Sequence, residues 1–143
     1  MKSVMKKTET RFPKNRPASL AEVALWIHQG VETSIAIGEF LDAYFASPHE
    51  AHGGFLETRP DSVALSDPWK TQVIDAYLSA MAECLSYRDG CPAPAWVFDA
   101  RFFLDKPWFA SPIDGLRPLL LMESPVFFRR RNLFVSKNAL SRA

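Results

Sequence analysis

The chain has 143 residues, of which 48% are hydrophobic and 13% aromatic, and its formal net charge is +1. This composition argues against a disordered chain, and the length allows one core without a metal or disulfide. The longest apolar run is far shorter than the about 20 residues of a membrane-spanning helix, and residues 1–16 lack the apolar stretch of a secretion signal. We therefore expect a folded, cytoplasmic protein with no membrane segment.

Charge is distributed unevenly along the chain. Residues 1–16 carry +5, residues 17–123 carry −9 and residues 124–143 carry +5. Two interpretations stay open: the basic ends neutralise the acidic middle, or a basic end reaches a second molecule. We expect residues 1–18 to form a basic, flexible arm and residues 19–143 to form a single α-helical domain.

Two helices are predicted in the first third of the chain. Ser19 and Glu22 form a capping box, in which each side chain satisfies a backbone N–H at a helix start. The helix after it runs to about residue 29 and ends at Gly30. A second helix covers about residues 31–46 and stops before Pro48. The short connection favours antiparallel packing of the pair.

Residues 49–60 contain two histidines that invite a metal-binding interpretation. His49 and His52 are three residues apart, whereas the zinc-protease motif HExxH places its histidines four apart. Gly53 and Gly54 weaken the helix that such a site would need. A short helix stays open for this segment, but we expect an exposed loop and no metal.

The strongest helix is predicted over about residues 66–88. Its apolar residues form a wide stripe, in which Cys84 is expected to be a buried thiol. The polar residues between them are expected to lie mostly on the solvent side, and these are Lys70, Asp75, Ser79 and Glu83. The pair Asp89 and Gly90 ends the helix.

The region from residue 91 to residue 123 is rich in proline and aromatic residues. Its prolines prevent one long helix, so we expect short helical turns with large rings packed over the long helix. A short helix is expected over residues 113–123. The fold class is therefore mainly α: a compact, small multi-helix domain with irregular connections.

A basic segment follows, with Arg129, Arg130 and Arg131 in succession. Ser124 is a suitable N-cap and Pro125 suits a first helical position, so a helix should begin there. Successive helical residues are about 100° apart, so the three side chains span about 200° and cannot all face one core. We expect residues 133–135 to be extended after this helix.

Arginine beside aromatic residues is the composition of a protein-binding hot spot. The candidate partner-binding residues are therefore these six: Phe127, Phe128, Arg129, Arg130, Arg131 and Asn132. The open question is whether the arginines lie at the surface or pair with acids within the chain.

The sequence offers little support for other functions. It lacks glycine-rich phosphate loops, and its histidines and cysteines form no recognisable catalytic arrangement, so we expect neither an enzyme nor a cofactor. Arginine with phenylalanine also suits single-stranded nucleic acid, but the acidic middle of the chain would repel phosphates. The oligomeric state is not predicted.

Much of the chain resembles a family of small bacterial proteins that are largely uncharacterised. The specific part is the block ESPxxFRRRNLFV at residues 123–135, and the further matching segments are residues 92–96, 102–109, 139–142 and 75–83, with a looser match over 19–46. Members are often encoded beside a nucleotidyltransferase-like protein, in what look like toxin–antitoxin pairs.

The resemblance implies an antitoxin-like protein that binds and neutralises a nucleotidyltransferase-type toxin, and it implies no catalytic residues. The alternative is a nucleic-acid-binding transcriptional regulator, as some members carry a helix-turn-helix domain. This chain lacks that domain in its N-terminal part, which argues against independent operator binding.

Overall fold

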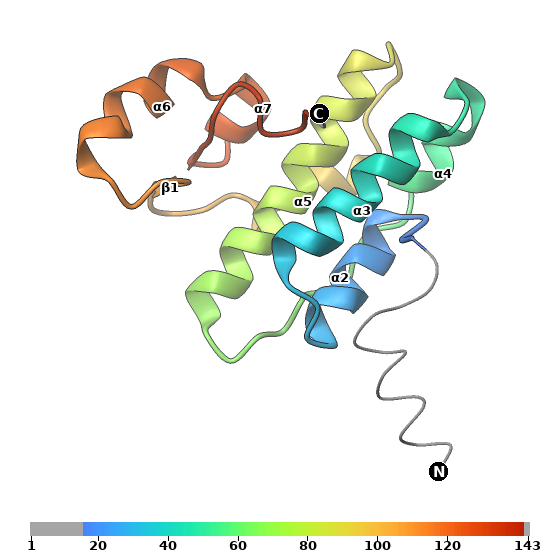
Figure 1. The fold of residues 1–143 in the computed structure, drawn as a ribbon, viewed down its shortest axis with the longest axis horizontal. Coiled ribbons are helices and arrows are strands. Elements are labelled where there is room, and N and C mark those ends of the chain that lie inside the picture. The colour runs from blue at the N-terminus through green and yellow to red at the C-terminus, as the bar shows by residue number, and fades with distance from the viewer. Residues whose placement is uncertain (1–15, 142–143) are drawn as a thin grey trace. The chain divides into compact units, whose positions relative to one another are not determined.

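The computed structural model describes residues 16–141, and the predicted arm lies mostly outside them. The fold is mainly α, as the sequence predicts (Figure 1). The chain divides into two compact units, an N-terminal unit ending at residue 65 and a C-terminal unit over residues 66–141. The single domain over residues 19–143 stays a prediction. Within the described residues, no helix combines the length and apolarity needed to cross a membrane.

Two helices, α2 (Leu20–His28) and α3 (Thr33–Ala46), form most of the N-terminal unit. The predicted capping box is present: Ser19 Oγ accepts from the Glu22 N–H at 3.1 Å, and Glu22 Oε1 accepts from the Ala18 N–H at 3.1 Å. Gly30 ends α2 with a φ of +106°, a conformation that favours glycine. The core residues of the pair include Leu20, Val23, Ile27, Phe40, Leu41 and Tyr44.

The segment predicted as an exposed loop is instead a 3₁₀ turn, η1 (His49–Ala51), followed by the short helix α4 (His52–Leu56). The His52 ring stacks on Tyr44 at 3.8 Å, and its Nε2 lies 2.8 Å from the Tyr44 carbonyl oxygen. Phe55 packs edge-on against Tyr44. These contacts hold the short helix that the sequence left open and that the two glycines disfavour, so the expectation of a loop was wrong.

The C-terminal unit is built on α5 (Pro68–Arg88). Its start agrees with the sequence: Asp67 is the N-cap and accepts from the Trp69 and Lys70 N–H groups at 3.0 and 3.3 Å. Gly90 follows its end with a φ of +71°. Cys84 is buried as predicted, and burial raises the pKa of its thiol.

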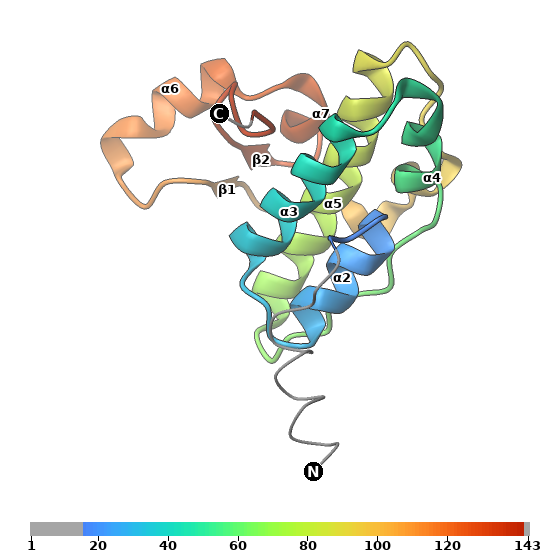
Figure 2. The same cartoon turned by 45° about the vertical axis from the view of Figure 1, so that its right-hand side comes forward.

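Short elements then pack on α5 and on one another, as Figures 1 and 2 show. In chain order they are η2 (Ala95–Phe98), η3 (Ala100–Phe102), β1 (Trp108–Phe109), η4 (Asp114–Leu116), α6 (Arg117–Glu123), α7 (Val126–Arg129) and β2 (Leu133–Phe134). The strands β1 and β2 are parallel, with Trp108 opposite Leu133. The predicted extended segment therefore pairs with the aromatic region.

The start of α7 differs from the prediction. Pro125 occupies the N-cap, and no side chain caps the helix. The buried Ser124 instead donates its hydroxyl to the Leu133 carbonyl at 2.8 Å and accepts from the Val135 N–H at 3.3 Å. Ser124 thus joins the end of α6 to β2. The N-cap prediction was wrong because the Ser124 hydroxyl bonds to the backbone of Leu133 and Val135 and not to the start of α7.

Candidate protein-binding surface

A polar stripe on α5 is buried. Asp75, Ser79 and Glu83 recur at steps of four residues, and each exposes no more than 7% of its surface. These three residues were predicted on the solvent side, and that prediction was wrong. Two arginines cover the stripe: Arg101 pairs with Asp75 at 3.6 Å, and Arg131 lies over Ser79 and Glu83.

Arg131 is completely buried and satisfied within the C-terminal unit. Its Nε donates to Ser79 Oγ at 2.6 Å, and its Nη1 donates to Glu83 Oε1 at 2.8 Å. The remaining bonds run from Nη1 to the Phe127 carbonyl at 2.7 Å and from Nη2 to the Val97 carbonyl at 2.8 Å. Four of the five N–H donors of a guanidinium group are thereby used.

The electrostatics of Arg131 follow from this enclosure. Burial lowers the pKa of Arg131, while the hydrogen bond and charge of Glu83 oppose that shift. The Phe103 ring also lies 4.5 Å from the guanidinium carbon. Because a buried charge without a partner is costly, Arg131 and Glu83 act as one structural unit that joins α5 to the turn after α7.

The other two arginines lie in different surroundings. Arg130 retains 47% exposure of its side chain and reaches the second Glu83 oxygen at 3.4 Å. Arg129, the last residue of α7, is exposed and has no side-chain partner among residues 16–141. The three arginines therefore range from fully enclosed to free, as the 100° spacing predicts.

The remaining candidate residues also separate into two groups. Phe128 is fully buried, with its ring 5.0 Å from that of Tyr77. Asn132 adopts a φ of +63° and donates its side-chain amide to the Leu104 carbonyl at 2.7 Å. Phe128 and Arg131 are thus enclosed by the fold and present no side-chain surface to a partner, which corrects the candidate list at these two positions, whereas Asn132 is half-buried.

Phe127 lies at the surface beside a residue that the sequence analysis missed. Its ring centre is 5.2 Å from that of Tyr87, whose exposure is 71%. The guanidinium carbon of Arg130 lies 5.5 Å from the Phe127 ring. We call Tyr87, Phe127, Arg129 and Arg130 the arginine–aromatic surface. Tyr87 continues the polar stripe by one further step of four beyond Glu83, a spacing visible in the sequence.

A second exposed region was also missed. Among the described residues, six of the eleven large apolar side chains that are exposed lie between residues 113 and 126: Ile113, Leu116, Leu119, Leu121, Met122 and Val126. On α6, only Leu120 is buried. The signal was present in the run of four apolar residues at 119–122, because consecutive helical residues cannot all face one core.

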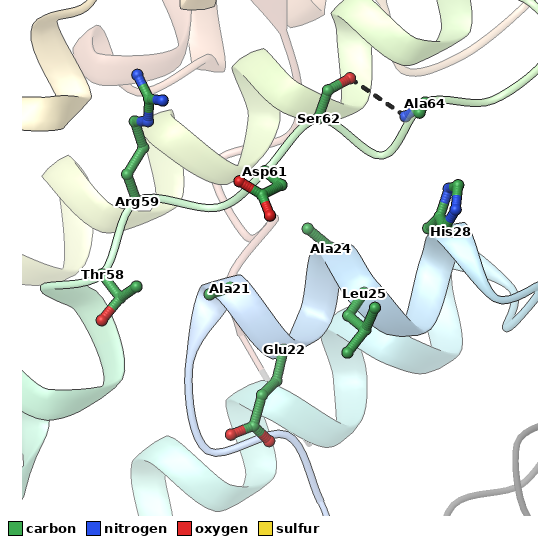
Figure 3. Close-up of a pocket in the computed structure, with 10 residues that line it drawn as sticks. All are labelled: Ala21, Glu22, Ala24, Leu25, His28, Thr58, Arg59, Asp61, Ser62 and Ala64. Carbon is green, nitrogen blue, oxygen red and sulfur yellow. Dashed lines mark hydrogen bonds between the residues drawn. The ribbon is translucent and has the colours of Figure 1, made fainter.

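The N-terminal unit has a groove of about 620 Å³ between α2 and residues 58–64 (Figure 3). Its polar groups are largely engaged: Glu22 belongs to the capping box, His28 Nδ1 lies 2.9 Å from the Val63 carbonyl oxygen, and Ser62 accepts from the Ala64 N–H. Arg59 points away from α2. Of these contacts, that of His28 with the Val63 carbonyl joins the segment to α2.

Potential metal ligands are similarly dispersed. No group of three or more histidine, cysteine or acidic side chains comes together in the part of the chain that the structure describes. The His49 and His52 rings are 5.8 Å apart, but His52 Nε2 faces backbone carbonyls of Tyr44 and Ser47. His52 therefore contacts the backbone carbonyls at the end of α3.

Comparison with known proteins found no matching family model, no matching curated protein and no matching solved structure.

Proposed function

We propose that this chain is a non-enzymatic protein that binds a partner protein through the arginine–aromatic surface. Excess positive charge at that surface supports the proposal. Glu83 is shared by Arg130 and Arg131, and Arg129 adds a third positive charge. Arg131 already makes the shorter contact with Glu83, so Arg129 and Arg130 remain able to bind an acidic partner.

The aromatic residues give this charged surface an anchor. Tyr87 and Phe127 supply large rings with few rotatable bonds, and tyrosine and arginine are enriched where truncation weakens binding most. The surface is built on α5 and α7, which the buried Arg131 network holds together. A rigid base reduces the entropy lost when the partner binds.

A nucleotidyltransferase-type toxin is the partner we propose, which makes the chain antitoxin-like. The active site of such an enzyme is built to hold a metal ion and a triphosphate. Exposed guanidinium groups can form paired hydrogen bonds with the acidic residues that hold the metal ion and thereby take the place of the metal. Arg129 and Arg130 would block the site in this way.

The test is co-purification of the tagged chain from its native cells, with quantitative mass spectrometry of the bound proteins. We expect one stoichiometric partner with the wild type and its loss with Arg129→Gln/Arg130→Gln. The control Lys70→Gln/Lys106→Gln removes the same charge from exposed positions outside the surface. Equal recovery of the partner by both variants would contradict the proposed surface.

The partner class has its own test. A nucleotidyltransferase-type partner transfers a nucleotide from a labelled triphosphate to a substrate, and the wild-type chain should suppress this transfer at a one-to-one ratio. The nucleic-acid-binding alternative predicts instead that the free chain binds labelled oligonucleotides with an affinity that falls steeply with salt.

A further inference from the structure

The chain contains two Asp–Gly steps, at residues 89–90 and 114–115. An aspartate side chain can be attacked by the backbone nitrogen of the next residue, and glycine favours this attack because it has no Cβ to restrict backbone rotation. The first step follows the end of α5, and the second lies in the single turn η4. The fold gives the two steps different surroundings, so they should differ in reactivity.

Asp89 and Gly90 are held by the last turn of α5. Their N–H groups donate to the carbonyls of Leu85 and Tyr87 at 3.1 and 3.0 Å, and the Cys91 N–H donates to a third carbonyl of α5 at 2.9 Å. Asp89 is half-buried, and Gly90 has a φ of +71°. Because the Gly90 N–H is occupied and the backbone on both sides of it is bonded, attack on Asp89 would require the helix end to open.

Asp114 and Gly115 lie in an open part of the C-terminal unit. Residues 112–119 are all exposed, and the Asp114 side chain exposes 86% of its surface. Its pair with Arg117 at 3.5 Å is weak at this exposure. The backbone bond of the turn, at 3.0 Å, uses the Leu116 N–H and the N–H of neither reacting residue. The backbone at Gly115 can therefore rotate toward the Asp114 carboxyl group at little cost.

We propose that Asp114 isomerises spontaneously to isoaspartate in the folded protein. The Gly115 nitrogen attacks Cγ of the protonated Asp114 carboxyl group, the new N–C bond closes a succinimide ring, and the carboxyl hydroxyl leaves with the amide proton as water. Water then adds to the α-carbonyl carbon of the ring and breaks its bond to the nitrogen, so the main chain passes through Cγ. This goes beyond the proposed function, because it involves no residue of the arginine–aromatic surface and needs no second protein or cofactor.

The product should be a modification that the fold tolerates. Isoaspartate lengthens the main chain by a methylene group at η4, and the helix α6 that follows has only Leu120 buried. The free carboxylate stays exposed, so the net charge is unchanged. The modified chain should therefore stay folded, and its new carboxylate should be accessible to an isoaspartyl methyltransferase, the class of enzyme that methylates this group with S-adenosylmethionine.

Incubation of the purified full chain in neutral buffer at physiological temperature tests this, with samples taken over several weeks. An isoaspartyl methyltransferase with labelled S-adenosylmethionine measures the amount of isoaspartate. The endoprotease Asp-N locates it, because this enzyme cleaves before aspartate but not before isoaspartate. We expect isoaspartate to accumulate at residue 114 and not at residue 89. The same chain unfolded in guanidinium is the reference and should react at both steps.

Two variants test the chemistry. Gly115→Ala should form isoaspartate at least about fivefold more slowly, because a Cβ restricts the rotation that the attack needs. This variant should fold, since no heavy atom apart from those of its chain neighbours lies within 4 Å of a Cβ at residue 115. Asp114→Glu should form none at this position, because the longer side chain would need a larger ring.

Three results would overturn the proposal. The first is a folded wild type that stays unmodified at residue 114. The second is equal accumulation at residues 89 and 114 of the folded chain, which would show that the fold does not select the site. The third is an undiminished rate in Gly115→Ala, which would show that the Gly115 backbone does not control the reaction.

Discussion

Two helices of the C-terminal unit reverse the usual relation between polarity and burial. α5 buries Asp75, Ser79 and Glu83, whereas α6 exposes Leu119 and Met122. The polar residues are buried because Arg101 and Arg131 give them ion pairs and hydrogen bonds. The apolar residues are exposed because α6 lies at the edge of the unit with only Leu120 inside. Burial therefore follows the partners that the fold supplies.

Different residues should therefore determine the stability of the fold and the binding of a partner. The interior of α5 and α7 should be sensitive to small changes, because charged groups there depend on one another. The outer surfaces of α6 and α7 should tolerate the same kinds of change without loss of stability, because their side chains have few partners within the chain. Four experiments test this contrast.

The largest effect is expected from Arg131→Met. Removal of this side chain leaves Glu83 without its shortest partner at a site that exposes 7% of the residue, which should cost about 3–5 kcal/mol of unfolding free energy. Urea denaturation measures this loss of unfolding free energy. The double variant Arg131→Met/Glu83→Met should recover much of the loss, since no buried charge is left alone. A loss below about 1 kcal/mol in the single variant would contradict the structural role.

Adjacent phenylalanines provide the next contrast. Phe128 is fully buried and Phe127 is only partly covered. Phe128→Ala should therefore cost about 3 kcal/mol or more, and Phe127→Ala about 1 kcal/mol or less, in the same denaturation experiment. Similar losses in both variants would mean that Phe127 belongs to the core and cannot anchor a partner.

Alkaline pH tests the enclosure of Tyr77, which lies against Phe128. Burial raises the pKa of Tyr77 from 10.0 to about 12, so the folded state favours the neutral phenol. The corresponding stability is fully present below pH 10 and is lost as the pH rises toward 12. Wild type should lose about 2 kcal/mol more than Tyr77→Phe across this window. Parallel pH profiles of the two proteins would show that the phenol is not enclosed.

The smallest effect on stability is expected at α6. Leu119→Ser/Met122→Ser changes two side chains with exposures of 48% and 80%, so the unfolding free energy should change by no more than about 0.5 kcal/mol. Circular dichroism during thermal unfolding provides the measurement. A large loss would show that these residues pack inside the unit.

Local signals predicted most of the helices. Ser19 with Glu22, Asp67 before Pro68, and Gly30 and Gly90 after helix ends act within a few residues, so the sequence contains the whole interaction. At α4 the sequence left a short helix open but favoured a loop, because the stability of this helix comes from packing on Tyr44 and not from its own glycine-rich sequence.

The candidate site was predicted only in part. The spacing of the arginines correctly implied different surroundings, but it could not say which of them is buried. Arg131 meets Ser79 and Glu83 across 52 and 48 residues of sequence. Periodicity within α5 assigns these polar residues to solvent, because it contains no information on distant arginines. The exposed face of α6 could have been inferred from the apolar run at residues 119–122.

The most direct test of the account measures stability and binding on the same preparation of Arg129→Gln/Arg130→Gln. We expect its urea unfolding free energy to lie within about 1 kcal/mol of the wild type, because Arg131 keeps Glu83 paired, while the co-purified partner is lost. Full recovery of the partner by this folded variant would contradict the proposed surface, and unfolding of the variant would show that these arginines serve the fold.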